Sequence, residues 1–288
     1  MQLKEIRTIF HKELDSLFPN EEVDQFFFML IDHYLNLHRL DLALQPNLII
    51  SKEEETPLFE GLSKLKMECP IQYILGTSHF FGMDLHVNKH VLIPRPETEE
   101  LVAWILADLK NKETQTTILD IGTGSGCMAI TMAKHCPTAK VYALDVSEEA
   151  LKIAMQNALN QDVAIEFIHA DILQIKNLGI AFDLIVSNPP YVRTMEKKEM
   201  KGNVLQHEPE QALFVPDSDP LLFYRNITKF AKNNLRENGA LYFEINQYLG
   251  KETEQLLKDQ HFSEIEMRKD LFDNDRMLKG IWTKRSQT

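Results

Sequence analysis

The 288-residue sequence lacks long hydrophobic runs. No apolar stretch approaches the about 20 residues that a membrane-spanning helix needs. The N-terminal stretch MQLKEIRTIFHKELDSLF is charged and amphipathic, and it has no apolar signal-peptide core. We therefore expect a cytoplasmic protein that has no membrane partner.

Cysteine is scarce as well. The chain has three cysteines, Cys69, Cys127 and Cys136, and no two of them form a C-x-x-C pair. An odd and scattered set excludes a disulfide framework and offers no zinc-ligand spacing. The ten histidines show no H-E-x-x-H or other ligand pattern. The sequence therefore predicts no metal site.

Positive charge is also in short supply. Lys and Arg number 31 against 43 Asp and Glu, which gives a formal net charge of −12. A polyanion is repelled by such a chain unless a local basic patch overrides the net charge. The segment MEKKEMK is mixed in sign, so no such patch is visible. We expect no direct binding of nucleic acid.

Three segments differ in their patterning. Residues 1–75 carry apolar residues at helical spacing and predict a small helical domain, and residues 76–95 read as a β-hairpin linker broken by Gly and Pro. Residues 96–288 alternate strand and helix patterns, which is typical of a parallel sheet covered on both faces. We predict an α/β fold with a doubly wound, mostly parallel seven-stranded sheet and a C-terminal antiparallel hairpin.

A glycine-rich loop, DIGTGSG, follows the first strand of the predicted sheet and opens a helix. Doubly wound folds bind adenosine-containing ligands at this position. Gly122, Gly124 and Gly126 let the backbone turn sharply and approach a ligand closely. The spacing is G-x-G-x-G rather than the G-x-G-x-x-G of dinucleotide sites, which disfavours NAD.

Acidic residues end the next two strands. Asp145 in YALDVS lies at about the 20-residue separation at which a carboxylate reaches both ribose hydroxyls. Asp171 in IHAD lies where an adenine edge is expected, and a helix N-cap is an equally good interpretation of this residue alone. Together with the glycine loop, these acids predict a nucleoside-binding edge.

The fourth strand stops abruptly at IVSNPPYV. Asn-Pro and Pro-Pro are ordinary loop punctuation, so the motif by itself leaves a structural and a functional interpretation open. Here DIGTGSG, LDVS and NPPY together resemble the class I S-adenosylmethionine-dependent methyltransferases that act on planar amide or amino nitrogens. The flanking segments PIQYILGTSHFFGMDLHVNKHVLIPRPETEELV, HEPEQALF, FEINQ and KDLFDNDR resemble the HemK-type family of protein-(glutamine) methyltransferases.

The resemblance implies methyl transfer from S-adenosylmethionine to the amide nitrogen of the glutamine in the GGQ motif of peptide chain release factors. It also implies that the N-terminal helical domain docks the protein substrate. The predicted cofactor-binding residues are Asp120, Gly122, Thr123, Gly124, Ser125, Gly126, Asp145, Asp171, Ile172 and Asn188.

An amide nitrogen is a poor nucleophile, so it must be held and oriented while the methyl group approaches. The Asn188 side-chain carbonyl and the Pro189 backbone carbonyl can each accept one hydrogen bond from its two hydrogens. The family implies a flat aromatic face at Tyr191 and a place in the site for Glu208, and no catalytic His is needed. We predict Asn188, Pro189 and Tyr191 as catalytic, and the substrate-binding set as Asn188, Pro189, Pro190, Tyr191 and Glu208.

Other functions remain open on the sequence. Glutamine methylation of a ribosomal protein would use the same chemistry, and adenine amino methylation would use the same motif. The acidic net charge and the lack of a basic recognition insert disfavour the adenine substrate. A non-catalytic binding module is disfavoured by the intact glycine loop, Asp145 and Asn188.

Overall fold

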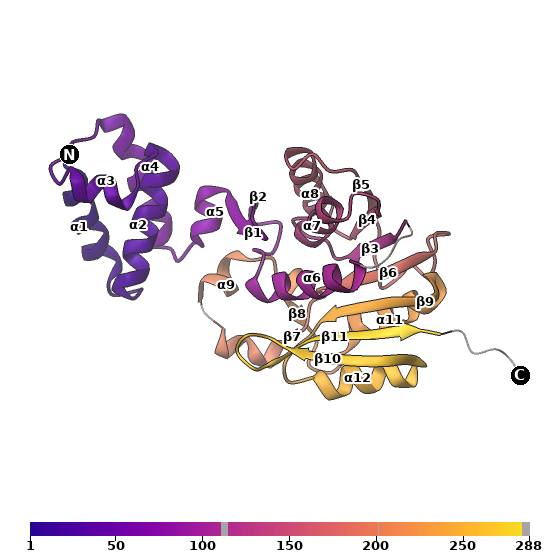
Figure 1. Ribbon diagram of the computed structural model, residues 1–288. Coiled ribbons are helices and arrows are strands. Elements are labelled where there is room, and N and C mark those ends of the chain that lie inside the picture. Colours follow the sequence, from indigo (N-terminus) through magenta and orange to yellow (C-terminus); the bar gives the residue numbers. More distant parts are fainter. Residues whose placement is uncertain (111–114, 201, 284–288) are drawn as a thin grey trace, which may run out of the picture. The chain divides into compact units, whose positions relative to one another are not determined.

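The computed structural model describes residues 1–110, 115–200 and 202–283. Within them the chain divides into two compact units. The first is helical and has its own apolar core. It also includes α9, although the sequence neighbours of α9 belong to the other unit: Nε2 of His207 lies 2.8 Å from the Met67 carbonyl oxygen. Its helices are α1 (Leu3–Leu14), α2 (Asn20–Leu35), α3 (Arg39–Leu44), α4 (Lys52–Leu65), α5 (Ile71–Leu75) and α9 (Gly202–His207) (Figure 1).

Apolar spacing explains the helices of this unit. In α1, Leu3, Ile6, Phe10 and Leu14 recur at three- and four-residue steps, and all four are fully buried. Residues at these steps share one face of a helix. The N-terminal helices were expected from this pattern, and the structure confirms them.

The second unit is built on a seven-stranded sheet with the order β10-β11-β9-β6-β3-β4-β5. Strands from β9 to β5 pair in parallel, whereas β11 pairs antiparallel with both β9 and β10. This arrangement confirms the predicted fold class. The strands are β3 (Thr117–Ile121), β4 (Lys140–Asp145), β5 (Ile165–His169), β6 (Phe182–Ser187), β9 (Leu235–Glu244), β10 (Phe262–Lys269) and β11 (Asp275–Trp282).

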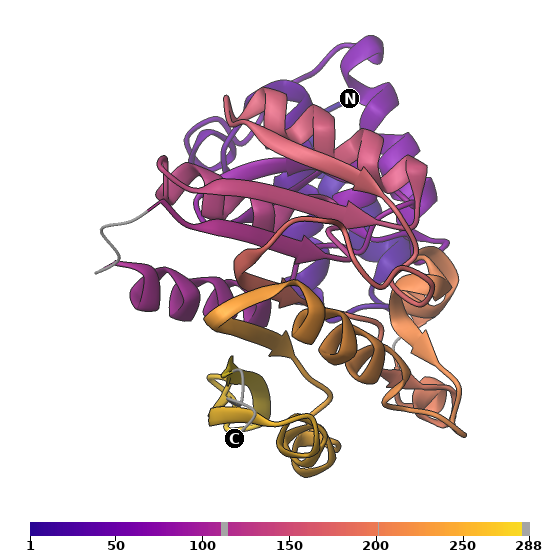
Figure 2. The ribbon, with the colours of Figure 1, turned by 90° about the vertical axis from the view of Figure 1, so that its right-hand side faces the viewer.

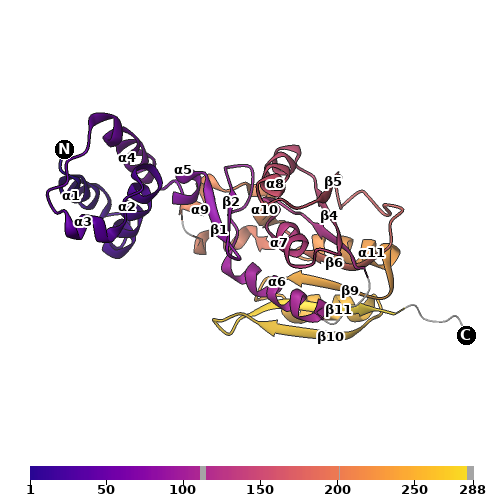
Figure 3. The ribbon, with the colours of Figure 1, turned by 45° about the horizontal axis from the view of Figure 1, so that its top comes forward.

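Helices cover both faces of this sheet (Figures 2 and 3). Alternate residues of β6 explain why: Leu184 and Val186 pack into the core beneath α6, α7 and α8, whereas Ile185 packs into the core beneath α11 and α12. The helices of this unit are α6 (Pro96–Leu109), α7 (Cys127–His135), α8 (Glu148–Asn160), α10 (Glu210–Leu213), α11 (Leu222–Asn234), α12 (Gly250–Asp259) and the 3₁₀ helix η1 (Thr194–Glu199).

Two small two-stranded sheets complete the second unit. The hairpin of β1 (Thr77–Phe80) and β2 (Met83–His86) contributes Phe80, Met83 and Leu85 to the core of the large sheet. The segment expected as a linker is therefore packed into this unit. The other small sheet pairs β7 (Val192–Arg193) with β8 (Phe214–Val215) in parallel.

The strand order of the large sheet indicates where a ligand-binding crevice should lie. From β3 the chain continues to β4 and β5 on one side, whereas β6 lies on the other side of β3. Ligands of open α/β sheets bind outside the carboxyl ends of the strands at such a switch point. None of the helices within the described ranges combines the length and apolar character needed to cross a membrane.

Candidate active site

The glycine loop connects β3 directly to α7. It folds back on the end of β4, because the backbone N–H groups of Gly122 and Thr123 both donate to the Leu144 carbonyl, at 2.8 and 3.1 Å. The loop closes with a 2.8 Å bond from the Gly126 N–H to the Thr123 carbonyl. The backbone thus holds the loop at the carboxyl edge of the sheet.

Two of the loop glycines serve different needs. Gly124 has a φ of +55°, and a Cβ built on it would meet no atom within 4 Å, so the backbone there borders open space. Gly126 has a φ of +84°, and a Cβ would stand 2.9 Å from Ile130 Cδ1 and 3.1 Å from Ala154 Cβ. Gly124 therefore leaves room for a ligand, and Gly126 allows α7 and α8 to pack closely.

Asp145 ends β4 and faces the same space. Its Oδ2 accepts a 2.9 Å hydrogen bond from the Gly124 N–H, and its Oδ1 accepts one of 2.9 Å from the Ser147 N–H. Burial raises the pKa of this carboxyl, while these backbone donors act in the opposite direction. An ionised carboxylate has about four lone-pair sites, so Asp145 keeps acceptor capacity for a ligand.

Asp120 lies behind the loop rather than in the cavity wall. It is fully buried, its Oδ2 accepts a 2.7 Å bond from the Thr123 hydroxyl, and its Oδ1 has no hydrogen-bond partner among the described residues. Burial raises the pKa of Asp120 to about 7, and the nearby charge of Asp145 adds to the shift. Asp120 thus contacts the glycine loop through its hydrogen bond with Thr123.

Asp171 and Ile172 follow β5 and line the cavity. The Asp171 carboxylate accepts 2.8 Å bonds from the Leu173 N–H and the Gln174 side-chain amide, so it caps its own turn. Ile172 is buried and gives the wall an apolar surface. Asp171 thus caps a turn and not the helix that the N-cap interpretation expected, and it lies at the cavity.

The strand β6 ends at Ser187, whose hydroxyl donates 2.7 Å to the Ile121 carbonyl and ties β6 to β3. Asn188, Pro189 and Pro190 come next, and all three line the cavity. The prolines fix the backbone directly after the strand. The predicted motif is therefore brought to the same cavity as the glycine loop and Asp145.

A buried polar network lies behind Asn188. The Asn188 Nδ2 donates 3.2 Å to the Thr98 Oγ1, and the Thr98 hydroxyl donates 2.6 Å to Oε2 of Glu244, the last residue of β9. The Tyr191 hydroxyl donates 3.0 Å to Glu244 Oε1. Burial raises the pKa values of both Glu244 and Tyr191. The Tyr191 hydroxyl thus faces Glu244, and Tyr191 does not line the cavity among the described residues.

Glu208 also acts from outside the cavity wall. It is buried, and its Oε1 accepts a 2.6 Å bond from Nη2 of Arg95, which lines the cavity. Its Oε2 lies 3.4 Å from the Ile93 backbone nitrogen, which donates to it. Glu208 therefore holds the segment before α6 against the site.

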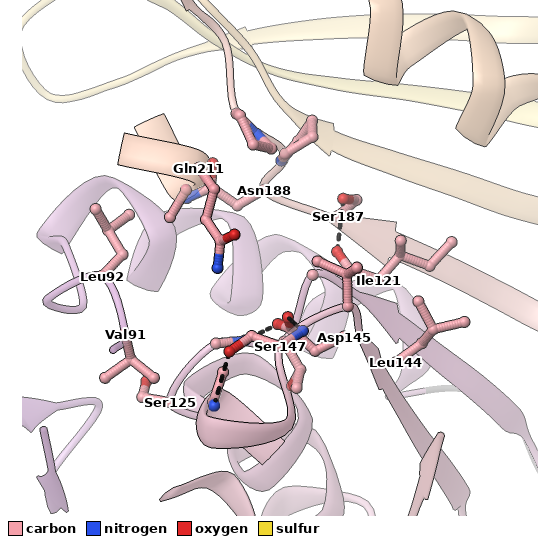
Figure 4. Close-up of a pocket in the computed structure, with 18 of the residues that line it drawn as sticks. Val91, Leu92, Ile121, Ser125, Leu144, Asp145, Ser147, Ser187, Asn188 and Gln211 are labelled. Carbon is pink, nitrogen blue, oxygen red and sulfur yellow. Dashed lines mark hydrogen bonds between the residues drawn. The ribbon is translucent and has the colours of Figure 1, made fainter. Parts of the chain in front are cut away.

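The cavity has a volume of about 300 Å³ (Figure 4). Of the predicted residues, Asp120, Gly126, Tyr191 and Glu208 are outside its lining. Sequence reasoning missed Ser147, Ser187, Gln211 and the 90–94 segment, which also line it. Ser147 follows Asp145 closely and could have been found as the N-cap of α8. The predicted residues in the lining are Gly122, Thr123, Gly124, Ser125, Asp145, Asp171, Ile172, Asn188, Pro189 and Pro190.

These residues fit a nucleoside-bearing cofactor. The open side of Gly124 leaves a cradle that a Cβ would fill, and Asp145 retains acceptor sites beside it. Ile172 offers an apolar wall, and the Asn188 amide lies at another side of the same cavity. No group of three His, Cys, Asp or Glu side chains in the described ranges is arranged to hold a metal ion.

Two protein families match the sequence. Residues 101–214 match the family described as methyltransferase small domain. Residues 13–76 match the family described as PrmC N-terminal domain. The two matches do not overlap, and the second lies within the helical unit.

Curated relatives match almost the whole chain. A release factor glutamine methyltransferase of Flavobacterium psychrophilum is 50% identical and covers 97% of this chain and 99% of its own length. A release factor glutamine methyltransferase of Bacteroides thetaiotaomicron is 41% identical, over 96% of this chain and 99% of its own.

Solved structures share the fold. A methyltransferase from Pyrococcus furiosus aligns with a TM-score of 0.51 at 16% identity, over 81% of this chain and all of its own. A 16S rRNA N2 G1207 methyltransferase from T. thermophilus aligns with a TM-score of 0.53 at 16% identity, over 72% of this chain and 50% of its own. At this identity the likeness concerns the fold alone.

Proposed function

This chain belongs to the family of release factor glutamine methyltransferases, and from that premise we propose that it transfers a methyl group from S-adenosylmethionine to a glutamine of peptide chain release factors. The acceptor is the side-chain amide nitrogen of the GGQ motif. The observation that carries the proposal is the meeting of Asn188 and Asp145 at one cavity.

The cofactor side of the site is the part of the cavity around the glycine loop. When bound, S-adenosylmethionine supplies an electrophilic methyl group on a sulfonium. Asp145 would accept hydrogen bonds from the ribose hydroxyls, and Gly124 would let the backbone lie close to the ligand. Asp171 and Ile172 would border the adenine.

The acceptor side is the Asn-Pro-Pro segment. The Asn188 Oδ1 and the Pro189 carbonyl would each accept one hydrogen from the glutamine amide, which turns its nitrogen lone pair toward the methyl group. The prolines hold both acceptors in place because their φ angles are fixed. Tyr191, which lies outside the cavity lining and is anchored on Glu244, would hold the end of this segment in place.

The N-terminal helical unit is proposed as the docking domain for the protein substrate, since the residues that match the PrmC N-terminal domain fall in it. A release factor as substrate would place the enzyme in the cytoplasm, where translation takes place. Glutamine methylation of a ribosomal protein is the closest competing function. The net charge of −12 argues against nucleic acid as a substrate.

Methyl transfer to purified substrates tests the proposal. Radiolabelled cofactor should label a bacterial release factor, and the label should vanish when the GGQ glutamine of that factor is changed to alanine. Duplex DNA at low salt and purified ribosomal proteins serve as the competing substrates. Label on adenine or on a ribosomal protein, with none on release factor, would replace the proposed substrate.

A further inference from the structure

We propose that Thr98 and Glu244 are positioning residues that fix which end of the Asn188 side-chain amide faces the acceptor. The inference rests on the proposed function, because it concerns how Asn188 meets a substrate amide. It assigns a role to a threonine in α6 that lines the cavity together with Asn188, and to a glutamate at the end of β9 that lies outside the cavity lining.

The three side chains form one hydrogen-bonded chain. Thr98 Oγ1 stands 2.6 Å from Glu244 Oε2 and 3.2 Å from Asn188 Nδ2. Thr98 and Glu244 are buried, with 3% and 1% of their surface exposed. The Thr98–Glu244 contact therefore lies away from competing water, whereas the Asn188–Thr98 contact is partly buried at the cavity.

The number of hydrogens decides the direction of the chain. An ionised carboxylate only accepts, so the single hydroxyl hydrogen of Thr98 points at Glu244. The hydroxyl oxygen then has only lone pairs left for Asn188. Of the two ends of the Asn188 amide, only the NH₂ end can satisfy them, so Nδ2 faces Thr98 and Oδ1 faces away.

This polarity matches what the acceptor requires. A glutamine amide nitrogen carries two hydrogens and needs acceptors opposite them. With Oδ1 turned to the cavity, Asn188 offers an acceptor. With the amide reversed, the N–H groups of Asn188 would face the N–H groups of the substrate glutamine. The substrate amide would then lose this hydrogen bond.

Glu244 also fixes the other end of the Asn-Pro-Pro-Tyr segment. Its second oxygen accepts from the Tyr191 hydroxyl at 3.0 Å. One carboxylate thus holds Tyr191 directly, and it holds Asn188 indirectly through Thr98. A buried carboxylate is a weak source of stability because of its desolvation cost, so its place here is better explained by orientation than by folding energy.

Three substitutions test the inference. Thr98→Val keeps the shape and removes the hydroxyl, and kcat on release factor should fall by about 10- to 100-fold. Cofactor affinity from calorimetry and KM for release factor should stay within about twofold, since ground-state binding is only weakly affected. Thr98→Ser restores the hydroxyl and should recover most of kcat. Thr253→Val is the matched control, because Thr253 is a buried residue of α12 whose hydroxyl donates to the carbonyl of Leu249, the residue before that helix.

Each outcome decides the question. A Thr98→Val enzyme with wild-type kcat overturns the inference, and so does an equal loss in Thr98→Ser or Thr253→Val. Should Thr98→Val fail to fold, Glu244→Gln decides: its amide can donate to Thr98 and release the fixed polarity, so kcat should fall, and an unchanged kcat overturns the inference. A wild-type protein that does not methylate release factor overturns the proposed function itself, and the inference with it.

Discussion

The carboxylate of Asp145 holds the backbone of Gly124 by a 2.9 Å hydrogen bond. The acid at the end of β4 and the loop after β3 therefore form a single preorganised element. A ligand that meets Asp145 meets a loop already fixed in place, and its binding need not order that loop.

Replacing Asp145 tests this element. Asp145→Ala should weaken binding of S-adenosylmethionine by roughly 1.5 to 3 kcal/mol, because charge-assisted hydrogen bonds to the ribose are lost. Isothermal calorimetry measures the change. Asp171→Ala is the comparison, and a smaller loss is expected there because Asp171 is less buried than Asp145, so water weakens its hydrogen bonds to a ligand more. Wild-type affinity in Asp145→Ala would contradict the assignment.

Asn188→Ala should reduce kcat by about 100-fold or more while the melting temperature and cofactor affinity change little. The reason is that the Asn188 side chain donates to Thr98 at the cavity edge and lies outside both apolar cores of the second unit. Steady-state kinetics measures kcat, and thermal denaturation measures the melting temperature. An unfolded variant, or one with full turnover, would favour the interpretation of the motif as loop punctuation.

Substitutions at two glycines of the loop should have different effects, one mainly on stability and the other mainly on cofactor binding. Gly126→Ala places a Cβ 2.9 Å from Ile130 at a positive φ and should cost about 3 kcal/mol of unfolding free energy. Gly124→Ala meets open space, so it should cost only about 1 to 2 kcal/mol and mainly weaken cofactor binding. Urea denaturation and calorimetry measure the pair, and equal stability losses would contradict the packing argument.

Much of this arrangement could be predicted from local sequence. Alternation of strands and helices gave the sheet, and turn residues at successive strand ends gave Gly124, Asp145 and Asn188. The polar network could not be found in that way. Thr98 lies 90 residues before Asn188 and 146 before Glu244, and no periodicity connects positions so far apart.

The location of Asp120 shows a second limit. A strand-end carboxylate beside a glycine loop looks like a ligand-binding group, but β3 directs this one into the protein, where it bonds to Thr123. Side-chain direction at the last residues of a strand depends on where the loop turns, and sequence spacing does not fix that turn.

Asp120 should make stability depend on pH. Its folded-state pKa is raised to about 7, so the folded protein holds this proton more tightly than the unfolded chain, and the associated stability is lost as pH rises toward 7. Asp120→Asn removes the titration. From about pH 5 to pH 8 the stability of the variant relative to wild type should rise by on the order of 2 to 3 kcal/mol, measured by urea denaturation. A difference independent of pH would show that the Asp120 pKa is not raised.

Acidification should lower kcat through Glu244. Burial raises its pKa, so it gains a proton at a higher pH than an ordinary glutamate, and the fixed polarity of Thr98 is then lost. Arg276 opposes this shift and Glu97 adds to it, Tyr191 donates to the carboxylate, and the charge of Glu244 in turn raises the pKa values of Tyr224 and Cys127. The fall of kcat at low pH should disappear in Glu244→Gln. If the variant shows the same fall as wild type, another group is responsible for it.

The strand β11 is synthesised after β9 and β10, yet it lies between them in the sheet. Until it emerges from the ribosome, β9 has an open edge next to apolar Leu241 and Phe243, and β10 has no partner strand to pair with. Glu244 ends that same β9, and Arg276 approaches it from β11. We therefore expect a nascent chain to complete its sheet, and with it the setting of Glu244, only after β11 has been made.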